Sequence, residues 1–166
     1  MKARPNIDAL FGTFDVDFDA GTLRWKNTIN SRARRGSRAG TLNGAGYRQV
    51  ALNGTLLLEH RVIWAMLHKK WPTKELDHID SNRSNNSVSN LRLATRSQNA
   101  CNGRPHKNNS SGVKGVHWSA ARKTWNAQIT LHGKGIHIGV FNTLADATIA
   151  VRKARRQIHG EFTNHG

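Results

Sequence analysis

Cysteine is almost missing from this chain, because Cys101 is the single cysteine among 166 residues. One cysteine forms no internal disulfide, and it cannot build a zinc site that needs several thiolates. We therefore expect no structural zinc. Any bound metal would be held by oxygen or by imidazole nitrogen, which favours a hard divalent ion.

Long apolar runs are missing too. No stretch approaches the ~20 apolar residues that span a bilayer. The first residues, MKARPNIDALFG, lack the apolar core of a signal peptide. The sequence therefore predicts a cytoplasmic protein that does not bind a membrane.

Acidic residues are few: 10 Asp and Glu stand against 26 Lys and Arg, and the formal net charge is +16. Seven basic residues and no acidic one lie between Ala20 and Leu58, and nine basic residues and no acidic one lie between Ser81 and Ala145. Such stretches repel themselves unless counterions or phosphates are close. A solvated basic surface is the alternative, above all for SRARRGSR at 31–38. Elsewhere aromatic and β-branched residues interleave with the charge, so we expect double-stranded DNA as the partner.

The first hundred residues carry signals for short strands and one helix. Glycine turns separate β-like runs, and Asn53-Gly54 is a strong hairpin signal. A helix is expected over 59–70, because apolar side chains recur there at helical spacing, at Val62, Ile63, Met66 and Leu67. This part should be rich in β-hairpins and should bury one face of the helix.

The pattern changes after a polar, turn-rich linker at 104–112. Three short strands are expected in GVKGVHW, TWNAQITLHG and KGIHIGVF, followed by an alanine-rich helix between the N-cap Thr143 and Gly160. The predicted fold class is α+β, with one domain over 1–103 and a second over 113–166.

The stretch LDHIDSNRSNNSVSNLRLATRSQNA at 76–100 holds the densest set of chemical groups. It reads as a strand at 76–79, an Asn/Ser loop at 80–89, a strand at 91–94 and a helix from Arg96, because Thr95 and Gln98 form a capping-box pattern. The loop-shaping residues are expected to be Asp80, Asn82, Asn85 and Asn86. Neighbouring residues of a strand point to opposite faces, so Asp77 and His78 can serve one site only where the strand bends or ends.

These residues resemble the HNH endonucleases, whose ββα-metal motif begins with His, passes a central Asn and ends with His or Asn. His78, Asn90 and Asn99 are twelve and then nine residues apart. Similarity to the homing-endonuclease branch extends to NN at 85–86, NL at 90–91, QN at 98–99 and the HR pair His60 and Arg61.

The resemblance implies a DNA-cleaving enzyme that needs one divalent ion, Mg²⁺ or Mn²⁺, and no small-molecule cofactor. His78 would be the general base, since imidazole titrates near neutral pH. Asp77 and Asn99 would hold the ion through oxygen. Asn90 would hold the loop through its amide. His60 and Arg61 would support the site from behind, and for His60 a hydrogen-bonded structural role is the simpler interpretation.

Residues 112–162 resemble an AP2 domain, a three-stranded DNA-binding sheet backed by a helix. The resemblance lies in KGVHW, TWNAQI, IGVF, the alanine-rich helix and HGEFTN. Alternation along 124–132 separately predicts one apolar and one polar face. The expected DNA-contacting residues are Lys114, His117, Arg122, Lys123, Asn126, Gln128, Thr130 and His137. The reading residues differ from the plant AP2 pattern, so a target sequence cannot be carried over.

The combined interpretation is a metal-dependent, site-preferring DNA endonuclease of homing or mobile-element (phage-type) character. The main alternative is a sequence-specific DNA-binding regulator with an inactive nuclease motif. The presence of Asp77, His78, Asn90 and Asn99 together argues against it, because a binder has no use for that set. An RNA-binding protein is less well supported, because no stacking motif of the usual RNA folds is present. The sequence leaves the oligomeric state open.

Overall fold

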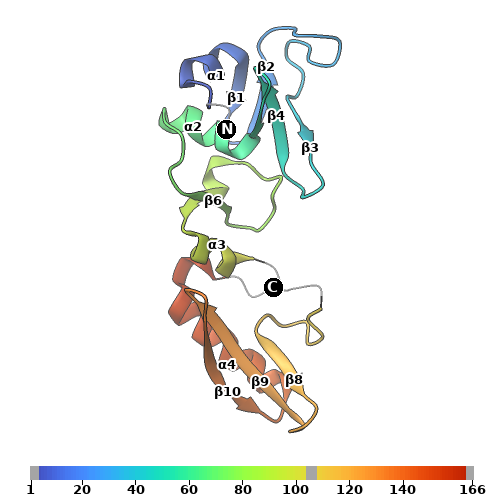
Figure 1. The fold of residues 1–166 in the computed structure, drawn as a ribbon, viewed down its shortest axis with the longest axis vertical. Helices are drawn as coiled ribbons and strands as arrows, with labels where there is room; N and C mark the ends of the chain where they lie inside the picture. The colour runs from blue at the N-terminus through green and yellow to red at the C-terminus, as the bar shows by residue number, and fades with distance from the viewer. Residues whose placement is uncertain (1–3, 104–107, 164–166) are drawn as a thin grey trace. The chain divides into compact units, whose positions relative to one another are not determined.

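The structure is a computed structural model that describes residues 4–103 and 108–163. It divides into two compact units, Met1–Leu93 and Ala94–Gly166, and Figure 1 shows the elements of each. The predicted domain limits of 1–103 and 113–166 stay a prediction. Part of the predicted linker, residues 104–107, lies outside the described residues.

The first unit is built from small sheets and two helices, and its elements follow the predicted order with four additions. The additions are α1, which begins after the N-cap Asn6, the strands β1 and β3, and the 3-10 turn η1. The sequence prediction missed all four. The elements are α1 (Ile7–Thr13), β1 (Phe14–Asp17), β2 (Thr22–Trp25), β3 (Thr41–Leu42), β4 (Arg48–Leu52), β5 (Thr55–Leu58), α2 (Glu59–His68), β6 (Glu75–His78), η1 (Val88–Asn90) and β7 (Leu91–Ala94).

The hairpin predicted at Asn53-Gly54 is confirmed. Strands β4 and β5 pair antiparallel, with Leu52 opposite Thr55. Both turn residues have positive φ, 50° for Asn53 and 70° for Gly54, as a two-residue hairpin turn requires. Strand β5 then runs directly into α2 at Glu59.

Helix α2 buries Val62, Ile63 and Met66 in the core of the first unit, as predicted. Leu67 does not join them, because its side chain is 41% exposed. It lies about 100° around the helix from Met66, at the edge of the buried stripe, and Ala65 is buried instead. The helix ends at His68 rather than at 70, since Lys69 adopts a left-handed conformation with φ 52°.

The second unit contains the predicted three strands and long helix. Its elements are α3 (Arg96–Asn102), β8 (Val116–Ser119), β9 (Thr124–Leu131), β10 (Lys134–Phe141), α4 (Leu144–His159) and η2 (Gly160–Phe162). The strands form an antiparallel sheet in the order β10-β9-β8. Helix α4 packs against it and buries Ala147 and Val151 with Ala127 and Ile129 of β9. The mixed α and β fold class is confirmed.

Helix α3 packs with the second unit. Cys101 is buried with Ala94 and Phe162, and the backbone N–H of His132 donates to the Ser97 hydroxyl at 3.2 Å. These contacts explain why the first compact unit ends at Leu93. Among the helices of the described residues, none has the length and apolar character needed to cross a membrane.

Candidate active site

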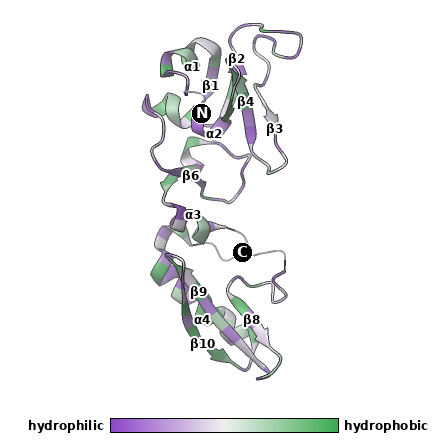
Figure 2. Cartoon of the chain, viewed as in Figure 1, coloured by the Kyte–Doolittle hydropathy of each residue, from purple (hydrophilic) through white to green (hydrophobic). Residues whose placement is uncertain are grey.

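The order strand, loop, strand, helix predicted for 76–100 is present. Strands β6 and β7 pair with each other, and the Ile79 N–H donates to the Asn90 carbonyl at 2.9 Å. The predicted capping box of α3 is confirmed, because Thr95 and Gln98 exchange both side-chain to backbone hydrogen bonds. The loop between the strands is mostly hydrophilic in Figure 2, yet it contains two buried asparagines, Asn86 and Asn90.

Asn90 joins the two sides of this loop through its amide. Its Oδ1 accepts from the Asp80 N–H at 3.0 Å, and its Nδ2 donates to the Asn85 carbonyl at 2.8 Å and to Asp80 Oδ1 at 2.9 Å. Desolvation works to raise the pKa of Asp80, but hydrogen bonds from Asn85, the Asn82 N–H and Asn90 hold it below its ordinary value. The loop is therefore fixed by its own polar groups.

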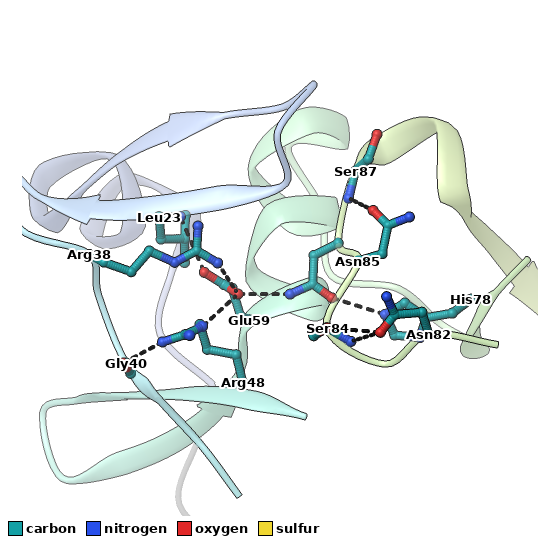
Figure 3. A network of polar contacts seen from close by, with 11 residues as sticks. Leu23, Arg38, Gly40, Arg48, Glu59, His78, Asn82, Ser84, Asn85 and Ser87 are labelled. Atoms are coloured by element: carbon teal, nitrogen blue, oxygen red, sulfur yellow. Dashed lines mark hydrogen bonds and ion pairs between the residues drawn. The ribbon is translucent and has the colours of Figure 1, made fainter. Parts of the chain in front are cut away.

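His78 is the last residue of β6 and is buried. Its Nε2 lies 2.9 Å from Asn86 Oδ1. The Asn86 side chain continues the contact, because its Nδ2 donates to Glu59 Oε2 at 2.7 Å. A chain of side-chain contacts therefore leads from His78 to the first residue of α2 (Figure 3).

Glu59 is a fully buried carboxylate with donors on both oxygens. The Leu23 N–H donates to Oε1 at 3.2 Å, and Arg38 Nη2 lies 3.0 Å from Oε2, with Arg48 Nε at 3.8 Å. Desolvation by burial raises the pKa of Glu59, against the opposing charge of Arg38 and the hydrogen bond from Asn86. The guanidiniums supply the positive charge that a buried carboxylate needs.

Gly21 allows the Asn86 segment to pack closely. A Cβ at position 21 would lie 2.0 Å from the Asn86 carbonyl carbon and 2.1 Å from the Ser87 nitrogen, and φ of Gly21 is +60°. Only glycine fits such an approach. The Val88 N–H also donates to the Phe18 carbonyl at 3.1 Å, so the backbone beside Asn86 is anchored to the β1–β2 hairpin.

His60 lies against His78, with ring centroids 5.0 Å apart in an edge-on arrangement. It is 4% exposed, and its Nδ1 has no hydrogen-bond partner. Burial, with smaller contributions from His78 and Arg61, lowers its pKa to about 3, so this imidazole is neutral at physiological pH. The expected hydrogen-bonded role is thus not seen at Nδ1, and His60 instead packs against the ring of His78.

Arg61 turns to a different part of the unit. Its guanidinium donates to the Pro72 carbonyl at 3.1 Å and to the Lys74 carbonyl at 3.5 Å. It therefore holds the turn after α2. The exposed Arg83 lies over a ring that neighbours the histidines: its guanidinium is 4.9 Å from the centroid of the Tyr47 ring, and that centroid is 6.0 Å from the centroid of the His78 ring.

Asp77 is buried and paired with Arg92. Its Oδ2 accepts from Arg92 Nη2 at 2.8 Å and from Nε at 2.9 Å. Asp77 and His78 therefore have different partners, as neighbouring strand residues should. The structure brings Asp77, His78 and Asn90 together in the first unit, and it places Asn99 in α3 of the second, where the Asn99 N–H donates to the Thr95 carbonyl at 2.9 Å.

The oxygen donors suit a hard divalent ion better than zinc. The described residues contain no group of three or more His, Cys, Asp or Glu side chains that could hold a metal. Burial raises the pKa of Cys101, which keeps it a thiol rather than a zinc-binding thiolate. A carboxylate and an amide oxygen are ligands that Mg²⁺ and Mn²⁺ accept. In the structure the Asp77 carboxylate is bound through Oδ2 by Arg92.

Sequence reasoning missed the residues behind His78. Asn86 was expected to shape the loop, and Glu59, Arg38, Arg48 and Gly21 were given no role at the site. One signal was present: Glu59 is the acidic residue that ends the acid-free stretch from Ala20 to Leu58. A lone acid at the end of such a basic stretch is a candidate for a buried ion pair.

The second unit presents most of its predicted DNA-contacting residues on one sheet face. Asn126, Gln128 and Thr130 alternate with the buried Ala127 and Ile129 along β9. His117 is the cross-strand partner of Asn126, and His137 is that of Gln128. Cross-strand partners share a face, so these five polar residues lie on the side of the sheet opposite α4.

Lys114 is placed differently from the expectation. Its ammonium donates to the Cys101 carbonyl at 2.8 Å, to the Gly103 carbonyl and to the Ala100 carbonyl at 3.5 Å. It neutralises the carbonyl end of α3 rather than joining the polar face, because a helix C-terminus attracts cations. Arg122 and Lys123 are exposed in the β8–β9 turn, as predicted.

Comparison with known protein families and proteins matches the part of the chain that holds the candidate site. The HNH endonuclease family matches residues 58–101. Protein 3.8 of Escherichia phage T7 is 38% identical over 87 residues, which cover 52% of this chain and 71% of that protein. The protein named uncharacterized HNH endonuclease L560 of Acanthamoeba polyphaga mimivirus is 34% identical over 105 residues, which cover 62% of this chain and 54% of the relative. No solved structure matches the chain significantly.

The matched segment runs from the start of α2 through the β6–β7 loop into α3. It contains both the predicted motif and the Glu59–Asn86–His78 contacts. The chain belongs to the HNH endonuclease family. The prediction of a DNA endonuclease is confirmed, and nucleases of this family generally use a divalent metal.

Proposed function

We propose that the chain is a metal-dependent DNA endonuclease that hydrolyses phosphodiester bonds at preferred sites and belongs to the homing or mobile-element type. The observation that carries the proposal is the setting of His78. Its imidazole ends β6 inside the family-matched segment, and Asn86 holds its Nε2. A histidine in a fixed orientation next to a loop of polar side chains suits proton transfer from water.

In the proposed mechanism, His78 is the general base that takes a proton from the attacking water. Asp77 and Asn99 would hold one Mg²⁺ or Mn²⁺ through their oxygens. The ion, when bound, supplies positive charge beside the phosphate oxygens. Asn90 keeps the loop folded so that His78 retains its position. The Arg92 guanidinium on Asp77 fixes the carboxylate in one rotamer.

Site preference is assigned to the C-terminal unit, which we propose is AP2-like. Its supporting features are three antiparallel strands, one helix on the apolar face and an exposed polar face. Amide and hydroxyl groups can read base edges in a groove, and the turn residues Arg122 and Lys123 can contact phosphates. The proposed base-reading residues are His117, Asn126, Gln128, Thr130 and His137.

The proposal is tested by cleavage of supercoiled plasmid DNA. The full chain should cut with Mg²⁺ or Mn²⁺, and EDTA should abolish cutting. His78→Ala should lower the single-turnover cleavage rate by ~10² to 10⁴-fold, the usual worth of a positioned base, with DNA affinity little changed. The matched control is His68→Ala, which removes an exposed histidine of the same unit and should cut like the parent.

Three outcomes would count against parts of the proposal. Cutting in EDTA would refute the metal requirement, and His78→Ala that cuts within a few-fold of the parent would remove His78 from the mechanism. If the parent binds DNA but never cuts it, the alternative of a DNA-binding regulator replaces the nuclease. Sequencing the cut ends tests site preference, and random ends would contradict it.

A further inference from the structure

The contacts behind His78 have a fixed direction of hydrogen bonding. Glu59 Oε2 is approached by Arg38 Nη2 at 3.0 Å and by Asn86 at 2.7 Å, and Oε1 by the Leu23 N–H at 3.2 Å. A guanidinium and a backbone N–H can only donate. Glu59 is therefore the acceptor throughout, and the Asn86 amide must turn its Nδ2 toward Glu59.

This orientation determines which nitrogen of His78 carries the proton. With Nδ2 toward Glu59, Asn86 presents its Oδ1 to His78 Nε2 at 2.9 Å. An amide oxygen can only accept, so Nε2 must be the protonated nitrogen. In a neutral imidazole the other nitrogen, Nδ1, then carries the lone pair.

We propose that Asn86 and Glu59 are positioning residues that hold the His78 ring in the Nε2–H form, so that Nδ1 is the atom that takes the proton from water. The proposal rests on the proposed function, in which His78 is the general base. Both residues are buried. They act through His78, in the way that a third group orients the base of a catalytic nucleophile.

The arrangement suits this role better than a purely structural one. Asn86 and Glu59 are both fully buried, and buried polar networks are often no more stable than apolar side chains of the same volume. Both residues of this network, Asn86 and Glu59, are also held by neighbouring parts of the unit. Gly21 lets the Asn86 backbone pack directly on the β1–β2 hairpin, and Glu59 is held by α2, Leu23 and Arg38. When His78 gains its second proton, Nε2 still donates to Asn86, so the protonated base fits the same contacts.

A double-mutant cycle in the full chain tests the proposal. Single-turnover cleavage is measured for the parent, Asn86→Ala, His78→Ala and the double variant, with DNA affinity measured in parallel. Asn86→Ala should lower the cleavage rate by about 10- to 100-fold, as loss of an orienting partner does, and affinity should change less than about threefold. In the His78→Ala background the same substitution should change the rate by less than about threefold, since there is no ring left to orient.

The matched control is Asn142→Ala, which removes an exposed asparagine that lies outside this loop and should stay within about twofold of the parent. Equal losses from Asn86→Ala in both backgrounds would show that Asn86 only holds the fold. No loss in the parent background, with His78→Ala inactive, would overturn the proposal and leave the proposed function intact. Full activity of His78→Ala would instead overturn the proposed function.

Nuclear magnetic resonance supplies a readout that does not depend on cleavage. In the neutral parent protein, the His78 Nε2–H proton should give a resolved signal, because burial and the Asn86 contact protect it from exchange with water. The signal should disappear in Asn86→Ala. Should that variant fail to fold, Glu59→Gln serves instead. Its amide can direct an N–H to Asn86, reverse the Asn86 amide and move the His78 proton to Nδ1. A parent protein whose proton sits on Nδ1, or a Glu59→Gln variant with an unchanged Nε2–H signal and rate, would overturn the proposal.

Discussion

Polar side chains are buried around His78 and exposed on the C-terminal sheet. Of the eight buried polar or charged residues in the described part of the chain, six lie between Glu59 and Asn90. Along β9, by contrast, Gln128 and Thr130 point to solvent while their neighbours Ala127 and Ile129 are buried. A buried polar group must keep one partner in one geometry, whereas an exposed one exchanges partners with water. The first arrangement suits chemistry that needs a fixed base, and the second suits contacts that form only when DNA arrives.

The largest expected effect of this difference is on stability. Glu59→Ala removes the acceptor of Arg38, Asn86 and the Leu23 N–H. Leaving buried donors without a partner should lower the free energy of unfolding by about 3 kcal/mol. The matched control is Asp15→Ala, which removes an ion pair with Lys26 whose side chains are 62% and 40% exposed, and it should cost less than about 1 kcal/mol.

The unfolding signal must come from the first unit alone. Trp118 and Trp125 are the two tryptophans of the second unit, so both are replaced by Phe in all proteins compared. Urea unfolding followed by the fluorescence of Trp25, Trp64 and Trp71 then reports the unit that contains Glu59. If the two substitutions cost the same, the buried contacts of Glu59 stabilise the unit no more than an exposed ion pair does, and the contrast between buried and exposed polar groups fails.

The sequence predicted what depends on local patterns. The Asn53-Gly54 hairpin, the capping box at Thr95 and the alternation along β9 were all readable, because each is set by residues close together in the chain. The spacing of His78, Asn90 and Asn99 led to the right enzyme family for the same reason.

What could not be predicted depends on contacts between distant residues. Glu59 and Asn86 are 27 positions apart, and Arg38 and Glu59 are 21 apart, so no local rule joins them. Gly21 was readable as a turn glycine, but its close approach to Asn86 depends on how the hairpin packs. Lys114 was predicted to contact DNA because of its charge. The sequence does not reveal that its ammonium binds the carbonyl groups at the end of α3. Tertiary packing decided each of these positions.

A second prediction concerns His60 and pH. Burial lowers its folded pKa to about 3, below the unfolded value near 6.5. Between these two values the unfolded chain holds a proton that the folded chain does not. The contribution of His60 to stability is therefore fully present above pH ~6.5 and is lost as the pH falls toward 3. At pH 5 the loss should be about 2 kcal/mol, since each pKa unit is worth about 1.4 kcal/mol.

His60→Phe isolates this contribution, because Phe keeps a ring beside His78 and cannot titrate. Other groups titrate in both proteins, so the difference between their unfolding free energies at pH 8 and at pH 5 reports His60. We expect the unfolding free energy of the variant, relative to that of the parent, to be about 2 kcal/mol higher at pH 5 than at pH 8. At pH 8 the variant should be as stable as the parent or slightly more so, because the unpartnered Nδ1 is gone. Parallel pH curves for the two proteins would show that His60 is not held neutral by burial.

The smallest effect is expected where the polar side chains are exposed, and there it should appear in DNA binding and not in folding. Replacing Arg122 and Lys123 together by Gln removes two exposed charges from the β8–β9 turn. If both contact phosphates, the slope of log affinity against log salt should shrink by ~1.8, because each neutralised phosphate contributes about 0.9. The free energy of unfolding should stay within about 0.5 kcal/mol of the parent.

Arg152 and Arg156 provide the matched control, since they are exposed on α4, which packs on the opposite face of the sheet. Their replacement by Gln removes the same charge. If both double variants reduce the slope of log affinity against log salt equally, DNA binding depends only on the net charge of this unit. That result would contradict the proposal that the polar face of the sheet contacts the bases.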